Sequence, residues 1–175
     1  MSFVSTKSEI TRAVAVGGRN LPRVVYAVLA LVMIIADQVT KAMVERMIPE
    51  HSIVPLIPGF LNLTHTKNPG VAFGLFSGSP APWKTAILVI ISAALLAMVV
   101  SMAWRPRELA WATGIGLALI LGGALSNLAD RIRAGRVVDF VDVYFRSFHW
   151  WAFNLADSAI VVGAVFLILH LILSK

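Results

Sequence analysis

The side chains in this sequence that are best suited to chemistry are aspartates that lie within or beside apolar segments. Five have this setting: Asp37, Asp130, Asp139, Asp142 and Asp157. Ionisable groups in apolar surroundings are costly, and membrane proteins keep them mainly for function or for pairing. Two such carboxylates that lie close together share one proton, and the pair then supplies a base and an acid. We therefore predict acid–base chemistry at a pair of these aspartates.

Other reactive side chains offer less. The sequence has no cysteine, which excludes thiolate nucleophiles, disulfides and thiolate metal sites. The histidines show neither an HExxH motif nor any other spacing typical of metal ligands, so a zinc protease is unsupported. We expect these residues at the surface or at the membrane interface: His51, His65, His149 and His170. The sequence predicts no metal and no cofactor.

The composition indicates a membrane protein of one domain. Of the 175 residues, 58% are hydrophobic and 14% are charged. A soluble domain has roughly 45–50% apolar residues. The net charge of +6 reflects 15 basic residues that are spread over loops and tails. This distribution favours membrane lipids with anionic headgroups as partners and argues against nucleic acid, which binds a concentrated basic patch.

Four segments are long and apolar enough to cross a bilayer, which takes about 20 helical residues. They are residues 24–44, 83–104, 109–128 and 155–173. The first is purely apolar only to Ala36, so Asp37 and Lys41 must lie within the membrane or at its edge. We predict an all-α membrane protein with four transmembrane helices in residues 24–175. Residues 1–23 are expected to form a polar cytoplasmic tail rather than a cleavable signal peptide.

The connections indicate which side of the membrane each end occupies. Arg105 and Arg107 lie in the tight turn between the second and third helices, and basic residues are densest in this turn and the two tails. By the positive-inside rule this side is cytoplasmic and holds both termini. The long segment at residues 45–82 then lies outside. Its residues 60–66 alternate apolar and polar, and turn residues at 68–70 precede a stretch at 71–76, which predicts a small extracytoplasmic sheet.

The third predicted helix carries a stripe of small residues. Gly114, Ala118, Gly122 and Ser126 are spaced by four, so they lie on one face of the helix. Small residues at this spacing let another membrane helix approach closely. We interpret the stripe as a packing surface.

The predicted topology brings the polar residues of distant segments to one membrane face. The first and third helices end on the outer side, and the fourth begins there. The residues that meet at this face are Asp37, Lys41, Asn127, Asp130, Arg131, Asp139, Asn154 and Asp157. We expect a single polar cluster at the outer edge of the bundle.

Structural roles explain part of this cluster. Asp37 and Lys41 are four residues apart on a helix and can neutralise each other. Asn127 and Arg131 have the same spacing, and we expect Asp130 to tie the following loop to Arg131. These residues predict a supporting network around a site.

A structural role is easier to assign to some polar residues near the fourth helix than to others. Asn154 followed three residues later by Asp157 is typical of a helix N-cap. Asp142 points away from Asp139 if residues 137–142 are extended, and we interpret it as structural. Asp139 is harder to explain, because its neighbours in the chain are apolar and a buried carboxylate needs a partner. Local physics therefore singles out Asp139.

Two functions other than catalysis fit a polar cluster in a membrane. A small proton-linked transporter would use Asp37, Lys41, Asp139 and Asp157 as a relay. A relay needs ionisable groups at several depths, whereas the cytoplasmic halves of the later helices have almost none apart from His170. A noncatalytic scaffold would need the small-residue stripe but not the polar cluster.

The sequence resembles the bacterial lipoprotein signal peptidases, also called type II signal peptidases, in five motifs that occur in order. They are residues 37–41 (DQVTK), 68–73 (NPGVAF), 122–131 (GGALSNLADR), 137–140 (VVDF) and 153–158 (FNLADS). The resemblance covers most of the chain after residue 23. It implies four spanning helices, cytoplasmic termini and an active site near the outer face of the bacterial cytoplasmic (inner) membrane.

The resemblance also implies an activity and its residues. Asp139 and Asp157 correspond to the catalytic aspartates of the family, so it is the motif that promotes Asp157 from helix cap to catalytic partner. The implied substrates are prolipoproteins whose lipobox cysteine carries diacylglycerol, cleaved just before that cysteine. The expected substrate-binding or site-supporting residues are Asp37, Lys41, Asn68, Gly70, Asn127, Asp130, Arg131, Asn154 and Ala156.

Overall fold

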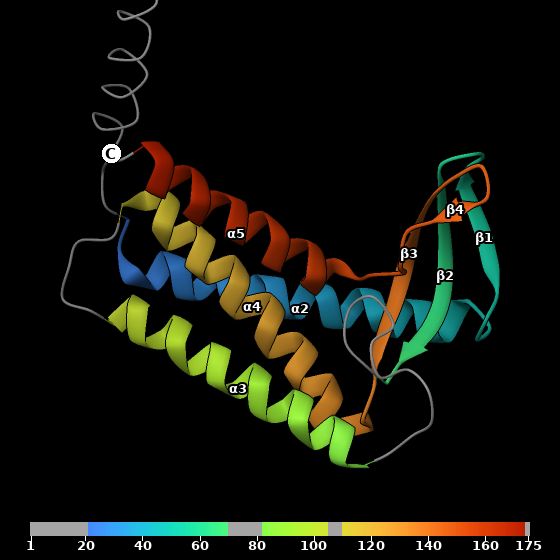
Figure 1. Ribbon diagram of the computed structural model, residues 1–175, viewed down its shortest axis with the longest axis horizontal. Coiled ribbons are helices and arrows are strands. Elements are labelled where there is room, and N and C mark those ends of the chain that lie inside the picture. The colour runs from blue at the N-terminus through green and yellow to red at the C-terminus, as the bar shows by residue number, and fades with distance from the viewer. Residues whose placement is uncertain (1–20, 70–81, 105–109, 174–175) are drawn as a thin grey trace, which may run out of the picture.

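The structure, a computed structural model, describes residues 21–69, 82–104 and 110–173, which form four long helices and one small sheet (Figure 1). The helices are α2 (Arg23–Met47), α3 (Pro82–Trp104), α4 (Trp111–Ala134) and α5 (Leu155–Leu173). They lie at the four expected places in the sequence. Helices α2 and α4 extend beyond the expected ends at residues 44 and 128, so more of the polar cluster is helical than the hydrophobic runs suggested.

The ends of α2 and α4 follow from local chemistry. Pro22 precedes α2, and Pro49 restricts Ile48 to the extended conformation in which it lies (φ −120°, ψ 118°), so the helix stops at Met47. Helix α4 ends at Gly135, whose φ of 68° is left-handed and costs glycine little. Its N–H donates to the carbonyl oxygen of Arg131 at 3.0 Å. The chain then turns directly into the segment that carries Asp139.

Helix α2 separates an apolar outer face from a partly polar inner face. Its buried residues are Tyr26, Ala30, Asp37, Lys41 and Val44. Its exposed large apolar residues include Val24, Val28, Leu31, Val32, Ile35, Val39 and Met43. Among the described residues, three helices, α2, α4 and α5, are long and apolar enough to cross a membrane. The exposed face of α2 is therefore suited to lipid, while Asp37 and Lys41 face the protein interior.

Helix α4 packs closely on two neighbours through its small residues. A Cβ atom on Gly122 would lie 2.7 Å from the carbonyl oxygen of Ala30 and 2.9 Å from Cβ of Met33, both in α2. Gly116 abuts the backbone of Gly163 in α5. The stripe predicted from the sequence is confirmed as a packing surface, and α2 is the helix that approaches it.

The sheet has four antiparallel strands in the order β1 (Ile53–Ile57), β2 (Leu61–Asn68), β3 (Val137–Phe145) and β4 (Phe148–His149). It lies at the end of the bundle where α2 and α4 end and α5 begins (Figure 1). The strand expected at residues 60–66 is confirmed as β2. The segment around Asp139, interpreted as extended over residues 137–142, is a nine-residue strand that pairs with β2. The expected stretch at residues 71–76 and Gly70 lie outside the described residues.

A small apolar core fixes the sheet to the bundle. Val44 and Ile48, at the end of α2, pack with Val138 and Phe140 of β3. These two β3 residues flank Asp139 in the sequence. The core therefore holds the backbone of Asp139 against the end of α2.

We predict that Gly122→Val destabilises the protein by about 1–3 kcal/mol, because the new side chain must displace the α2 backbone at Ala30. The unfolding of the purified protein in detergent, followed by heat or denaturant, measures this. Ala134→Val, at the exposed end of the same helix, is the control and is expected to leave stability close to wild type. Equal stability of the two variants would contradict the assigned helix contact.

Candidate active site

Asp139 is a buried carboxylate held by two amide side chains. It lies on β3 between Val138 and Phe140 and is 3% exposed. Asn154 Nδ2 donates to its Oδ1 at 2.7 Å, and Asn68 Nδ2 donates to its Oδ2 at 2.9 Å. These are the partners that the apolar surroundings led us to expect. Burial raises the pKa of Asp139 to about 6, helped by the negative charge of Asp157 and opposed by the two amide hydrogen bonds.

Asp157 has both the capping role expected from the sequence and a second contact. Its backbone N–H donates to Asn154 Oδ1 at 2.9 Å, and its Oδ2 accepts from the Asn154 backbone N–H at 3.3 Å. This reciprocal pair is a capping box at the start of α5. The remaining oxygen, Oδ1, accepts from Asn127 Nδ2 of α4 at 2.8 Å. The helix cap thus leaves one carboxylate oxygen directed at another element.

Asn154 joins the two aspartates. It is completely buried, and it contacts Asp139 through Nδ2 and Asp157 through both Oδ1 and its backbone N–H. Arg131 of α4 interacts electrostatically with both carboxylates, and its Nη1 donates to the carbonyl oxygen of Asn127 at 3.2 Å. Residues from β3, α4 and α5 therefore meet around one pair of carboxylates.

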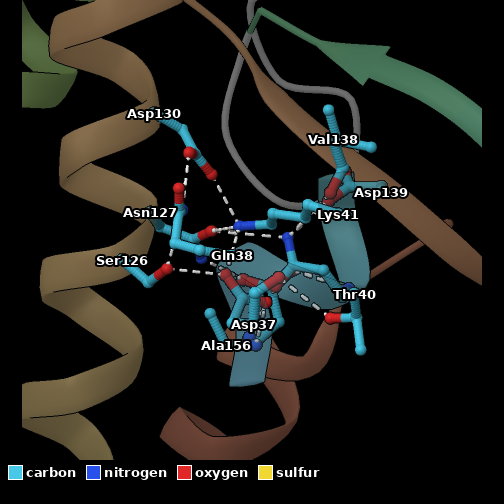
Figure 2. A network of polar contacts seen from close by, with 12 residues as sticks. Asp37, Gln38, Thr40, Lys41, Ser126, Asn127, Asp130, Val138, Asp139 and Ala156 are labelled. Atoms are coloured by element: carbon cyan, nitrogen blue, oxygen red, sulfur yellow. Dashed lines mark hydrogen bonds and ion pairs between the residues drawn. The ribbon is translucent and has the colours of Figure 1, made fainter. Parts of the chain in front are cut away.

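A second set of charged residues, centred on Lys41, lies between α2 and α4 (Figure 2). Lys41 Nζ lies 2.6 Å from Asp37 Oδ2, 2.6 Å from Asp130 Oδ2 and 2.8 Å from Asn127 Oδ1. The predicted pairing of Asp37 with Lys41 is confirmed. Asp130, which we expected to tie the following loop to Arg131, is directed at α2, where Gln38 Nε2 also donates to it at 2.7 Å. The network therefore connects α2 with α4.

Asp37 has a role that the sequence did not suggest. It is completely buried, and its Oδ1 accepts from the backbone N–H of Ala156 at 2.9 Å. Its Oδ2 accepts from Ser126 Oγ at 2.7 Å. Asp37 thus satisfies a free N–H at the start of α5, directly before Asp157. Because the first contact uses the backbone of Ala156, no side-chain pattern could have indicated it. Ser126, the donor in the second contact, belongs to the small-residue stripe predicted from the sequence.

Asp142 and His65 have hydrogen-bond partners outside the pair. Asp142 accepts from Asn62 Nδ2 at 2.8 Å and contacts His149 Nδ1 at 2.9 Å, and these partners support its structural interpretation. The surface location expected for His65 is wrong, because it is 4% exposed and its Nδ1 lies 2.8 Å from the carbonyl oxygen of Ile48. Among the described residues, no group of three or more His, Asp or Glu side chains is arranged to hold a metal ion.

The chemistry available to this arrangement is that of two coupled carboxylates. Asp139 can keep a proton up to about pH 6, because burial and the neighbouring charge favour its neutral form. The other can then act as a base, and together they are able to activate water. The carboxylates lie on β3 and in the first turn of α5, at the end of the bundle near the sheet (Figure 1).

Comparisons with known proteins find a family and relatives that match most of the chain. Residues 29–173 match the model of the family described as signal peptidase (SPase) II. The chain is 43% identical over 150 residues to a lipoprotein signal peptidase of Solibacter usitatus, covering 86% of this chain and 91% of that protein. It is 42% identical over 144 residues to one from Desulforapulum autotrophicum, covering 82% and 89%.

Two solved structures of a bacterial membrane enzyme have a similar fold. One superposes with a TM-score of 0.76 at 30% identity, over 85% of this chain and 87% of that one. The other has a TM-score of 0.73 at 28% identity, over 84% and 92%.

The burial of Asp139 predicts a pH-dependent cost to stability. Its pKa is 3.8 in an unfolded chain and about 6 in the folded protein, so between these values the folded state binds the additional proton. Stability therefore falls as the pH rises through this window and changes no further above it. Asp139→Asn lacks this titration, so its stability relative to wild type should increase by on the order of 3 kcal/mol across the window.

Unfolding of both proteins in detergent between pH 4 and pH 8 measures this difference. A difference that stays constant over the whole range would show that Asp139 titrates normally and is not held in the observed environment.

Proposed function

The chain belongs to the signal peptidase II family, and from this membership we propose that it is a membrane-embedded aspartyl endopeptidase with Asp139 and Asp157 as its catalytic dyad. Its proposed substrates are diacylglyceryl-modified prolipoproteins, which it cleaves immediately before the lipidated cysteine to remove the signal peptide. The observation that carries the catalytic type is the joining of buried Asp139 and half-buried Asp157 by Asn154.

The proposed reaction needs no covalent intermediate. The ionised carboxylate takes a proton from water as the water oxygen attacks the scissile carbonyl carbon. The protonated carboxyl donates a hydrogen bond to the oxyanion that develops. The tetrahedral intermediate then breaks its C–N bond as the leaving amine receives the proton taken from water. The pair finishes the cycle with one shared proton, as it began.

The other residues of the site are proposed to orient the dyad or the substrate backbone. Asn68, Asn127 and Asn154 donate hydrogen bonds to the aspartates, which supports an orienting role. Arg131 supplies positive charge near both carboxylates as negative charge develops on the substrate. Gly70 remains a prediction of the family motif. The proposed role of the network between α2, α4 and the start of α5 is to hold the residues that contact the dyad in place. Its members are Asp37, Lys41, Asp130 and Ala156.

We propose four membrane spans, with α3 as the fourth. Its 23 residues are enough to cross the hydrocarbon core, which takes about 20. Helix α2 begins and α5 ends at the bundle end opposite the sheet, where α3 also ends (Figure 1). Arg105 and Arg107 follow α3 in the sequence, so the positive-inside rule supports a cytoplasmic location for this end and both termini. The dyad would then lie near the outer face of the bacterial inner membrane.

The proton-linked transporter gains no support from the geometry. Asp37, Lys41, Asp139 and Asp157 belong to one connected network at the end of the bundle near the sheet. A relay would spread such groups across the membrane. Clustering at a single depth fits a catalytic site.

We predict that Asp139→Asn and Asp157→Asn each reduce the cleavage of a purified diacylglyceryl prolipoprotein in detergent by at least about a hundredfold, because either change removes an acid–base group of the dyad. The released signal peptide and the shortened lipoprotein are measured by mass spectrometry. Asp142→Asn is the matched control, since Asp142 is a buried aspartate of the same strand with partners outside the dyad.

The control is expected to retain most of the activity. Wild-type activity in either Asp139→Asn or Asp157→Asn would remove that residue from the dyad. A prolipoprotein without diacylglycerol is included as a second substrate and should be cleaved far more slowly. Equal cleavage of both substrates would overturn the proposed lipid requirement.

A further inference from the structure

Lys41 determines which way the amide of Asn127 faces. An ammonium group has three N–H donors and no acceptor, and those of Lys41 have three partners: Asp37 Oδ2, Asp130 Oδ2 and Asn127 Oδ1. The Asn127 atom that faces Lys41 must therefore be its carbonyl oxygen. Its Nδ2 is then left to donate to Asp157 Oδ1, at 2.8 Å. The orientation of this amide follows from donor and acceptor chemistry.

The carboxylate partners hold Lys41 in place. Asp37 also accepts from Ser126 Oγ and from the Ala156 backbone, and Asp130 also accepts from Gln38 Nε2. Lys41 is only 4% exposed, so water does not compete for its N–H groups. An ammonium with this coordination keeps its position, and the Asn127 amide cannot flip without breaking the contact to it.

The two aspartates differ in what fixes their donors. Asp157 accepts from the Asn127 amide, which a cation orients, and lies in the first turn of α5, where the helix dipole favours negative charge. Asp139 accepts only neutral side-chain amides from Asn154 and Asn68 in its described hydrogen bonds, and it is flanked by apolar residues on β3.

The charged groups around the pair come from two helices. Lys41 of α2 and Arg131 of α4 act on both aspartates, while Asp37 and Asp130 balance Lys41 on its far side. Since both cations act on both carboxylates, their field alone does not separate the two. The oriented Asn127 amide and the start of α5 distinguish the two aspartates, because each favours negative charge on Asp157.

We propose that Lys41 is a positioning residue that directs the Asn127 N–H at Asp157 and thereby makes Asp157 the ionised base, with the shared proton on Asp139. This inference rests on the proposed peptidase function and adds a division of roles within the dyad. The competing interpretation is that Lys41 only ties α2 to α4. The two interpretations differ in what they predict for the pH dependence of cleavage.

The first test is Lys41→Met, which removes the charge but keeps the length of the side chain. In detergent, with a diacylglyceryl prolipoprotein, we expect the acidic limb of the kcat/KM profile to move up by about one pH unit, because the base of the dyad loses its oriented donor. We expect kcat to fall about tenfold or more with little change in KM. Lys67→Met is the matched control, because Lys67 lies on β2 and pairs with Glu50. It should leave the pH dependence of kcat/KM unchanged.

The second test is Asn127→Asp, which separates positioning from tethering. A carboxylate at this position still accepts from Lys41, so the tie between α2 and α4 remains, but the N–H toward Asp157 is lost. The proposal predicts a large loss of kcat and an acidic limb at higher pH. Lys41→Met is also made in the Asn127→Asp background. The proposal predicts that it shifts the acidic limb of the kcat/KM profile less there than it does in the wild-type protein.

Each outcome decides the matter. An acidic limb that stays in place in Asn127→Asp, with activity near wild type, overturns the positioning role, and this holds even if Lys41→Met does not fold. A uniform loss in Lys41→Met without movement of the limb also overturns it. A folded wild-type protein that leaves the lipidated substrate uncleaved overturns the proposed function instead.

Discussion

A carboxylate buried in an apolar bundle requires donors, and this requirement organises the whole site. Asp37, Asp139 and Asp157 each accept from at least one donor on another element: the start of α5, strand β2 with the Asn154 segment, and helix α4, respectively. The same contacts that satisfy the charges therefore hold the helices and the sheet together. Removing one donor leaves a buried acceptor unsatisfied, at a cost of about 1–3 kcal/mol, so the site and the fold are coupled.

Close helix packing makes these short contacts possible. Gly122 lets the backbone of α2 approach α4, and the next position of the same stripe, Ser126, hydrogen-bonds to Asp37. Gly123, on another side of α4, abuts the backbone at Ala156, just before Asp157. Larger side chains here would separate the helices, and hydrogen bonds below 3 Å between side chains of different helices would be lost. The small-residue stripe and the polar network are thus parts of one interface between helices.

Much of this was predictable from the sequence, and what was not has physical reasons. Hydrophobic length located the helices, spacing predicted the Asp37–Lys41 pair and the capping by Asn154, and apolar neighbours indicated that Asp139 needs partners. Spacing along one helix cannot reveal contacts between elements, so the direction of Asp130 toward Gln38 and the contact of Asp37 with the Ala156 backbone were missed. The length of β3 was missed because its partner β2 lies about 70 residues earlier, as shown by the separation of 71 between Asn68 and Asp139. Helix capping alone explains the position of Asp157. Its expected catalytic role was therefore inferred from the family motif.

The central claim is that Asp139 and Asp157 act as one unit, and a double variant tests it most directly. The cleavage rate of Asp139→Asn/Asp157→Asn, compared with each single variant under single-turnover conditions, measures whether the two losses are independent. A dyad that shares one proton predicts that the double variant is about as slow as the slower single variant, because the first change already disables the pair. Losses that multiply in the double variant would show that the two aspartates act separately and would contradict the account.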